Sequence, residues 1–168
     1  MFDFKDKIVF ITGGSIGIGA KVIEFMLHEK VKHITALDIA GDKALPLQNA
    51  LNEKYGANKI RFIKGDVTNE DHLTGAFDAI LKDYGYVDVV VNNAGIMNDS
   101  KEMYKKEIEI NLLPAYYNRT GVRVLTVCFG ATNTSLLSKE KLGNFDKKID
   151  KELGRIGSHG DFRGYKER

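Results

Sequence analysis

Residues 12–19 read Thr-Gly-Gly-Ser-Ile-Gly-Ile-Gly and directly follow the apolar run of residues 8–11. The apolar run is typical of a buried strand, and the residues after Gly19 have helical spacing. Glycines remove the crowding of Cβ atoms, so the backbone between strand and helix can turn sharply and approach a ligand closely. The N–H groups and the positive dipole end of the helix face such a turn and bind phosphate. We therefore expect residues 13–19 to hold the pyrophosphate of a dinucleotide.

Apolar runs and helical patterns alternate along the chain. Strands are expected at residues 8–12, 33–38, 60–64, 87–92 and 123–129. Their continuous apolar character indicates burial on both faces, which is the habit of parallel sheets. Repeated strand–helix–strand units of this length predict a right-handed, doubly wound α/β fold.

Helical patterns fill the intervals between the first four strands. The first helix is expected to bury one face, made of Ile18, Val22, Phe25 and Met26. The third helix is expected to bury a longer stripe, made of Leu73, Ala76, Phe77, Ile80, Leu81 and Tyr84. The second helix should cover residues 43–55, with Asp42 as its N-cap and Pro46 tolerated near the first turn.

Length and composition place further bounds on the chain. Its 168 residues can bury one substantial core, so we expect a nucleotide-binding domain over residues 1–135 and a helical or frayed tail over residues 136–168. The 25 basic and 23 acidic residues are scattered, which argues against a nucleic-acid partner. Short apolar runs and an N-terminus without a signal-peptide pattern predict a cytoplasmic protein with no membrane contact. Cys128 is expected in the core, and surface positions without metal-ligand spacing are expected for His28, His33, His72 and His159.

The glycines depart from the usual dinucleotide fingerprint, because Val22 stands where its third glycine belongs. They fit the spacing Thr-Gly-x-x-x-Gly-x-Gly, and on this motif the chain up to Leu113 resembles the short-chain dehydrogenase/reductase family. The resemblance implies a Rossmann-like doubly wound parallel sheet, shortened here to about five strands, that binds NAD or NADP. Taken alone, the motif would also suit a glycine-rich turn without a ligand. The motif residues expected to bind the cofactor are Gly13, Ser15, Ile16, Gly17, Ile18 and Gly19.

Further matches stand at the carboxyl ends of the expected strands. Asp38 closes the second strand, 19 residues after Gly19, where dinucleotide folds place the acid that binds the adenosine ribose hydroxyls. Its carboxylate would repel a 2′-phosphate, so we expect NAD rather than NADP. From the residues alone, Asp38 would also suit a solvent-facing turn, and Asp66 a helix-capping loop. The resemblance adds to the cofactor site the residues Asp66, Val67, Asn93, Ala94, Gly95 and Thr134.

The spacing from Asn92 to Asn111, the expected strand around residues 121–130 and the Asn133-Thr134 pair after it resemble the 15-hydroxyprostaglandin dehydrogenase branch, particularly its insect members. This resemblance implies NAD-dependent oxidation of a secondary alcohol, with a small hydrophobic alcohol or ketone as the partner. Relatives dimerise through two long helices beside the active site, of which one is shortened and one lacking in this sequence. We therefore expect a monomer or an ill-defined oligomer.

Catalysis in the family uses an Asn, a Ser, a Tyr and a Lys, and only Asn111 is matched in register. The sequence that carries the Ser and the Tyr-x-x-x-Lys motif in relatives is lacking before Val122, which resembles an internal deletion. Tyr55 and Lys59 spell the motif elsewhere, but Gly56 and Asn58 between them indicate a turn. We expect an NAD-binding oxidoreductase whose catalysis is impaired. The alternative is a non-enzymatic NAD-binding or interaction module.

Overall fold

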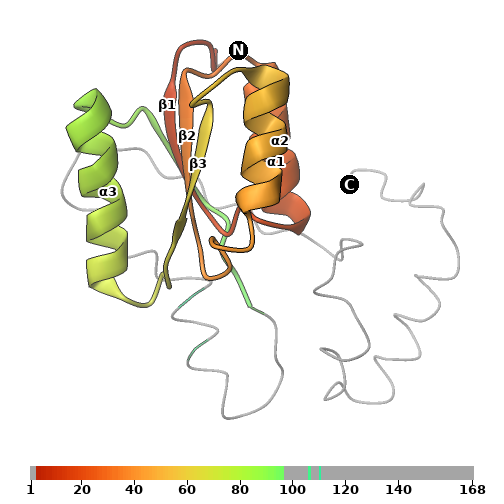
Figure 1. The fold of residues 1–168 in the computed structure, drawn as a ribbon. Helices are drawn as coiled ribbons and strands as arrows, with labels where there is room; N and C mark the ends of the chain where they lie inside the picture. The colour runs from red at the N-terminus through yellow and green to blue at the C-terminus, as the bar shows by residue number, and fades with distance from the viewer. Residues whose placement is uncertain (1–2, 97–105, 107–109, 111–168) are drawn as a thin grey trace, which may run out of the picture.

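Four apolar segments pair side by side into a parallel sheet. In the computed structural model, which describes residues 3–96, 106 and 110, these strands are β1 (Ile8–Thr12), β2 (His33–Asp38), β3 (Ile60–Lys64) and β4 (Val89–Asn92). Their order is β3-β2-β1-β4, so β1 and β2 are central (Figure 1). Every residue of β1 and β2 is buried, including the polar His33, Thr35 and Asp38 of β2, as is typical of the central strands of a parallel sheet.

The register aligns the carboxyl ends of the strands at one edge of the sheet. Thr12 at the end of β1 lies opposite Leu37 of β2 and Asn92 of β4. In the same way, Asp38 at the end of β2 lies opposite Lys64 at the end of β3. The loops that leave the four strands therefore meet at this carboxyl edge, which is the lower edge of the sheet in Figure 1.

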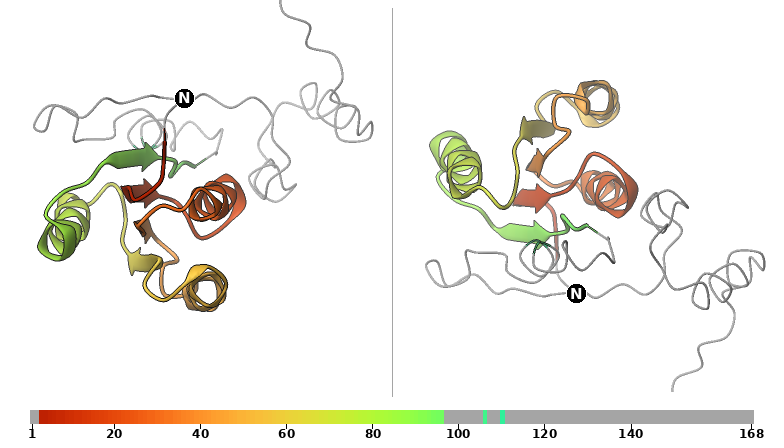
Figure 2. Two further views of the ribbon diagram at one scale, coloured as in Figure 1. Left: turned by 90° about the horizontal axis from the view of Figure 1, so that it is seen from above. Right: turned by 90° about the horizontal axis from the view of Figure 1, so that it is seen from below.

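Three helices cover the two faces of the sheet. α1 (Gly17–His28) and α2 (Leu45–Tyr55) lie on one face, and α3 (Glu70–Tyr84) lies on the other (Figure 2). This arrangement is the doubly wound fold expected from the alternation of strands and helices. None of the helices in the part of the chain that the structure describes is both long and apolar enough to cross a membrane.

Alternate residues of the strands build two separate cores. On the α1 and α2 face, Val9 and Ile11 pack with a group that includes Ile23, Leu27, Ile34 and Phe62. On the α3 face, Ile8 and Phe10 pack with Leu37, Leu73, Ala76 and Ile80. Burying an aliphatic or aromatic side chain of this size stabilises the fold by about 1.5–3 kcal/mol. β1 contributes to both cores, so it anchors the glycine-rich segment that follows it.

The buried face of α1 is rotated from the expected one. Its buried residues are Gly19, Ile23, Met26 and Leu27, whereas Phe25 is 55% exposed and contacts Phe4 edge to face. The reason is the close approach of Gly19 to the Gly13 carbonyl oxygen in the preceding turn. This contact fixes the rotation of α1 about its axis, and so it fixes which side chains face the sheet. The expected stripe of α3 is confirmed except for Leu81, which is exposed beside the buried Ile80.

Two expected boundaries are wrong by two residues. α2 begins at Leu45, and Ala44 rather than Asp42 is its N-cap, because residues 41–44 first form successive backbone turns. The Asp42 carboxylate instead pairs with the Lys64 ammonium at 3.2 Å. β4 begins at Val89 rather than at residue 87. Directly before it, the Asp88 backbone N–H donates to the Ile8 carbonyl oxygen at 2.9 Å, and the Asp88 carboxylate accepts the Ile8 N–H at 2.8 Å.

Several sequence predictions fall outside the residues that the structure describes. They are the strand at residues 123–129, the domain boundary after residue 135, the tail at residues 136–168, and the side chains of Asn111, Cys128, Thr134 and His159. The described sheet accounts for four of the about five expected strands.

Candidate functional site

The glycine-rich turn after β1 is pressed between the neighbouring strands and α1. Gly13 has a φ of +69°, and a Cβ atom there would lie 2.7 Å from the Ala94 Cα. A Cβ atom on Gly19 would overlap the Gly13 carbonyl oxygen. Only glycine fits at these two positions, for the conformation at the first and for lack of space at both. The two glycines therefore let the turn pack closely against α1 and the end of β4.

The helix that follows the turn begins without a protein cap. Ile16 occupies the N-cap position in an extended conformation, no side chain caps the helix, and its first turn contains no acidic residue. In contrast, the Asn69 side chain caps α3 by accepting the N–H groups of Asp71 and His72. Free N–H groups and the positive end of a helix dipole attract an anion. The start of α1 is thus suited to a pyrophosphate.

Asp38 lies beside the turn at the end of β2. Its Oδ2 accepts the Ser15 backbone N–H at 2.9 Å, and its Oδ1 accepts the Ala40 backbone N–H at 2.9 Å. The residue is 8% exposed, so it is not the solvent-facing turn residue that the sequence alone allowed. The structure thus places this carboxylate next to the glycine-rich turn.

Asn93 locks the end of β4 onto the turn. Its Nδ2 donates to the carbonyl oxygens of Thr12 and Gly13 at 3.0 Å and 2.6 Å. In return, the Thr12 Oγ1 accepts the backbone N–H groups of Asn93 and Ala94 at 3.2 Å and 3.0 Å. These four hydrogen bonds hold residues 93 and 94 against the glycines, and the exposed Gly95 follows directly. The Thr12 hydroxyl is a functional group that sequence reasoning missed, although Thr12 belongs to the motif.

Asp66 and Val67 follow β3 at the same edge. The Asp66 carboxylate accepts the Thr68 N–H at 2.9 Å and the Thr68 hydroxyl at 2.8 Å. The Thr68 backbone hydrogen bond is the main cause that lowers the pKa of Asp66. Val67 packs against the α3 core. The pair therefore shapes the loop that leads from the carboxyl edge into α3.

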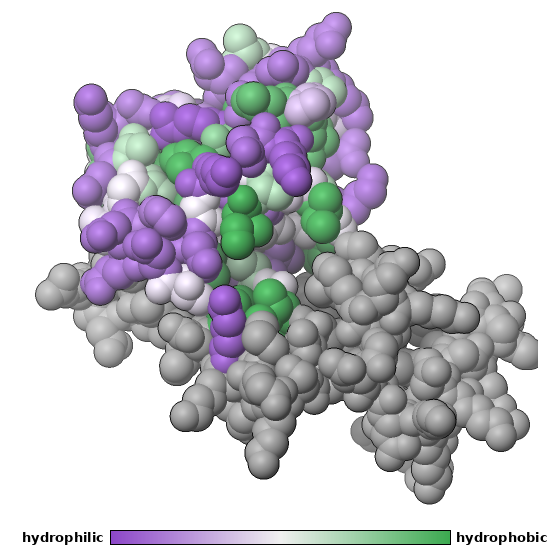
Figure 3. All heavy atoms as spheres, turned by 60° about the horizontal axis from the view of Figure 1, so that its bottom comes forward, coloured by the Kyte–Doolittle hydropathy of each residue, from purple (hydrophilic) through white to green (hydrophobic). Residues whose placement is uncertain are grey.

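Exposed apolar side chains accompany the polar groups at the carboxyl edge. Ile16 in the glycine turn is 64% exposed and Ile39, directly after Asp38, is 69% exposed. Leu45 at the start of α2 is also exposed. Figure 3 brings this edge of the molecule forward and shows hydrophobic side chains among hydrophilic ones. Ile39 was not singled out from the sequence. Its position directly after Asp38, the acid that ends β2, was the available signal.

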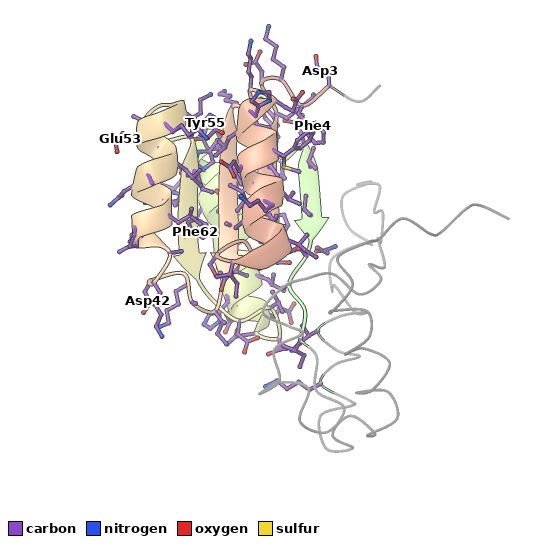
Figure 4. All side chains as sticks on the ribbon, turned by 90° about the vertical axis from the view of Figure 1, so that its right-hand side faces the viewer. Asp3, Phe4, Asp42, Glu53, Tyr55 and Phe62 are labelled. Carbon is purple, nitrogen blue, oxygen red and sulfur yellow. The ribbon has the colours of Figure 1, made fainter. Side chains whose placement is uncertain are left out.

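Tyr55 and Lys59 lie at the opposite edge of the sheet. The Lys59 ammonium donates to the Val31 carbonyl oxygen at 3.0 Å, just before β2 begins. Between the pair, Gly56 and Asn58 have φ values of 116° and 60°, so the two side chains do not share a helical face. Figure 4 shows Tyr55 at the end of the molecule opposite to Asp42, which belongs to the carboxyl edge. This placement agrees with the expected turn.

His33 corrects the expectation that the histidines are surface residues. It is 4% exposed, with its Nδ1 2.6 Å from the Asn58 carbonyl oxygen and its Nε2 3.1 Å from the Thr35 Oγ1. Burial is the main cause that lowers the pKa of His33. The Tyr84 ring covers the imidazole at 4.9 Å, and such aromatic cover cannot be read from local spacing. Within residues 3–96, 106 and 110, no cluster of His, Cys, Asp or Glu could hold a metal ion.

Comparison with known proteins places the chain in a family. The model of the short chain dehydrogenase family matches residues 7–117, so the chain belongs to that family of oxidoreductases. The chain is 31% identical over 107 residues to 15-hydroxyprostaglandin dehydrogenase [NAD(+)] of Macaca fascicularis, covering 64% of this chain and 39% of that protein. It is 32% identical over 134 residues to the cyclopentanol dehydrogenase of a Comamonas species, covering 70% of this chain and 48% of that protein.

Solved structures share the fold at lower sequence identity. A short chain dehydrogenase/reductase from Burkholderia phymatum, crystallised in complex with NAD, superposes with a TM-score of 0.59 at 23% identity. The match covers 68% of this chain and 42% of that one. It confirms the Rossmann-like parallel sheet. The chain spans less than half the length of the relatives named above.

Proposed function

We propose that this chain binds NAD along the carboxyl edge of its sheet. The proposal rests above all on the 2.9 Å hydrogen bond between the Ser15 N–H and the Asp38 carboxylate. This bond brings an acid suited to ribose hydroxyls next to the turn suited to a pyrophosphate. The residues proposed to contact the cofactor are Gly13, Ser15, Ile16, Gly17, Ile18, Gly19, Asp38, Asp66, Val67, Asn93, Ala94, Gly95 and, outside the described residues, Thr134.

The charge of Asp38 favours NAD over NADP. A 2′-phosphate on the adenosine ribose would lie against the Asp38 carboxylate, and two like charges in contact repel each other. The NAD named for the prostaglandin dehydrogenase and for the Burkholderia structure supports this choice. We expect calorimetric titration to give a lower dissociation constant for NAD than for NADP.

The proposed reaction is oxidation of a secondary alcohol, with a small hydrophobic alcohol or ketone as the substrate class. The named alcohol dehydrogenases among the relatives support this class. We further propose that turnover is impaired, because the sequence between Leu113 and Val122 lacks the Ser and Tyr-x-x-x-Lys of the family. Loss of general acid–base catalysis alone lowers a rate by about 10² to 10⁴. Asn111 is the remaining family catalytic position.

Two measurements on the full chain test this proposal. Isothermal titration with NAD tests binding, and NADH absorbance in the presence of cyclopentanol tests turnover. The proposal predicts saturable NAD binding with slow or no NADH production. Absence of heat at millimolar NAD would refute the proposed function. Rapid NADH production would refute the impairment and leave the binding site standing.

A further inference from the structure

We infer that Asp38 is also a positioning residue, whose carboxylate fixes the glycine-rich turn before any nucleotide is present. The inference rests on the proposed function only for its ligand, because the hydrogen bonds that carry it belong to the protein alone. A ribose-binding acid needs to contact only the ligand. Here both carboxylate oxygens are already bonded to the backbone of two different loops.

Asp38 connects three loops at the carboxyl edge. Its side chain joins the turn after β1, through Ser15, to the loop after β2, through Ala40. Its carbonyl oxygen accepts the N–H groups of Gly41 and Gly65 at 3.0 Å each, which ties the loop after β3 to the same residue. The nearby acids of the carboxyl edge bond elsewhere: the Asp66 carboxylate accepts from Thr68, and the Asp42 carboxylate accepts from Lys64.

The bond to Ser15 fixes the orientation of a peptide plane. The Ser15 N–H points at the carboxylate, so the peptide unit between Gly14 and Ser15 cannot rotate without breaking a hydrogen bond to a charged acceptor. Such bonds are about twice as strong as bonds between neutral groups. Gly13 and Gly14, which precede this bond, would otherwise leave the turn many conformations. The carboxylate thus lowers the ordering cost of phosphate binding.

The positioning role and the ribose role are compatible on one side chain. An ionised carboxylate has about four lone-pair sites on its two oxygens, and the described backbone bonds use two of them. Ribose hydroxyls can therefore donate to the sites that remain while Ser15 and Ala40 keep their bonds. Asp38 would then act on the phosphate through the turn and on the ribose directly.

Hydrogen exchange of the nucleotide-free chain tests whether Asp38 fixes the glycine-rich turn before any nucleotide binds. We expect Asp38→Ala to accelerate amide exchange at Ser15 and Ala40 by about tenfold, the factor that about 1.4 kcal/mol of lost protection produces. Asp38→Asn keeps one acceptor oxygen and should give an intermediate rate. Asp42→Ala is the matched control, because it removes the same charge from the same loop without touching the turn.

Nucleotides without ribose hydroxyls test whether Asp38 aids phosphate binding through the turn. ADP and 2′,3′-dideoxy-ADP are titrated into the wild type, Asp38→Ala, Asp38→Asn and Asp42→Ala. If Asp38 acted only on the ribose, the wild type and Asp38→Ala would bind dideoxy-ADP equally well. We expect Asp38→Ala to weaken dideoxy-ADP binding by about fivefold to tenfold, Asp38→Asn by less, and Asp42→Ala not at all.

The outcomes separate this inference from the proposed function. Unchanged exchange at Ser15, or equal affinity of wild type and Asp38→Ala for dideoxy-ADP, would overturn the positioning role and leave NAD binding intact. A wild type that binds neither ADP nor NAD would overturn the proposed function, while the exchange rates still decide the positioning role. If Asp38→Ala does not unfold cooperatively, Asp38→Asn provides both readouts.

Discussion

The hydroxyl of Thr12 holds two strands and the glycine turn together, and its removal tests the packing of the site directly. Thr12 is 4% exposed, and its Oγ1 accepts the N–H groups of Asn93 and Ala94. Thr12→Val keeps the β-branched shape and removes the acceptor. Both N–H groups then lose their partner at a position that the Gly13 backbone crowds.

The expected cost follows from the burial of the two donors. A buried donor without an acceptor costs about 1–3 kcal/mol. Asn93 and Ala94 are half-buried, so water can reach them in part and the lower end of the range applies to each. The free energy of unfolding should fall by about 2 kcal/mol, which lowers the urea midpoint by about 1 M for a domain of this size.

Urea unfolding of three proteins measures this effect. Thr12→Ser keeps the acceptor and loses one methyl group, so it should lower the stability by only about 1 kcal/mol. Thr12→Val should therefore be the less stable variant, and its faster amide exchange should be concentrated at Asn93 and Ala94. A Thr12→Val protein as stable as the wild type, or more stable than Thr12→Ser, would show that the hydroxyl does not connect the strands.

Three further changes test other parts of the structure. Because burial lowers the pKa of His33 below the 6.5 of an unperturbed histidine, its contribution to stability should be complete above pH 6.5 and decline as the pH falls towards the folded pKa. The urea midpoint of His33→Gln should consequently fall less between pH 7.5 and 5.5 than that of the wild type, and an equal fall would contradict this account. Gly19→Ala forces a Cβ atom onto the Gly13 carbonyl, so we expect about 1–3 kcal/mol of destabilisation in thermal unfolding together with weaker NAD binding. Tyr55→Phe and Lys59→Ala should leave the NAD dissociation constant within about twofold of the wild type, since both residues lie at the other edge of the sheet; a tenfold change would contradict that placement.

The charged groups around His33 set the direction of its pH response. Arg61 and Lys59 oppose the protonated imidazole, whereas Asp83 favours it, and the ring of Tyr84 covers it. Burial remains the larger effect. Glutamine at position 33 keeps a polar side chain and does not titrate, so it removes the pH dependence of this group without placing an aliphatic residue against Thr35.

Three strands were predicted at the bounds that the structure shows, and the reason is local. β1 and β2 are rich in apolar and β-branched residues and are buried throughout, whereas β3 alternates buried Ile60 and Phe62 with more exposed residues. Patterns of either kind leave few alternatives to a strand. β4 and α2 were predicted with the right type and the wrong start. The start of β4 depends on the bond between Asp88 and Ile8 of β1, and the start of α2 depends on the pairing of Asp42 with Lys64 of β3.

The candidate site also has features that the local sequence predicted and features that it did not. The glycine spacing, and acids and amides at strand ends, predicted which residues gather at the carboxyl edge, and the register confirms that these strand ends coincide. Their roles toward a nucleotide stay predictions. The bonds of the Thr12 hydroxyl to Ala94 and of the Asp38 carboxylate to Ser15 were not predicted, because each depends on a partner far away in the sequence.

Hydrophobic periodicity and glycine spacing predicted the type and succession of the described elements along the chain, and the family, because these patterns act over a few residues and need no tertiary contact. The buried side of α1, the burial of His33 and the bonds of Asp38 to three loops became visible in the folded chain. Each of these depends on how closely two backbones approach. That distance is set by the packing of the whole sheet, and no local pattern of residues specifies it.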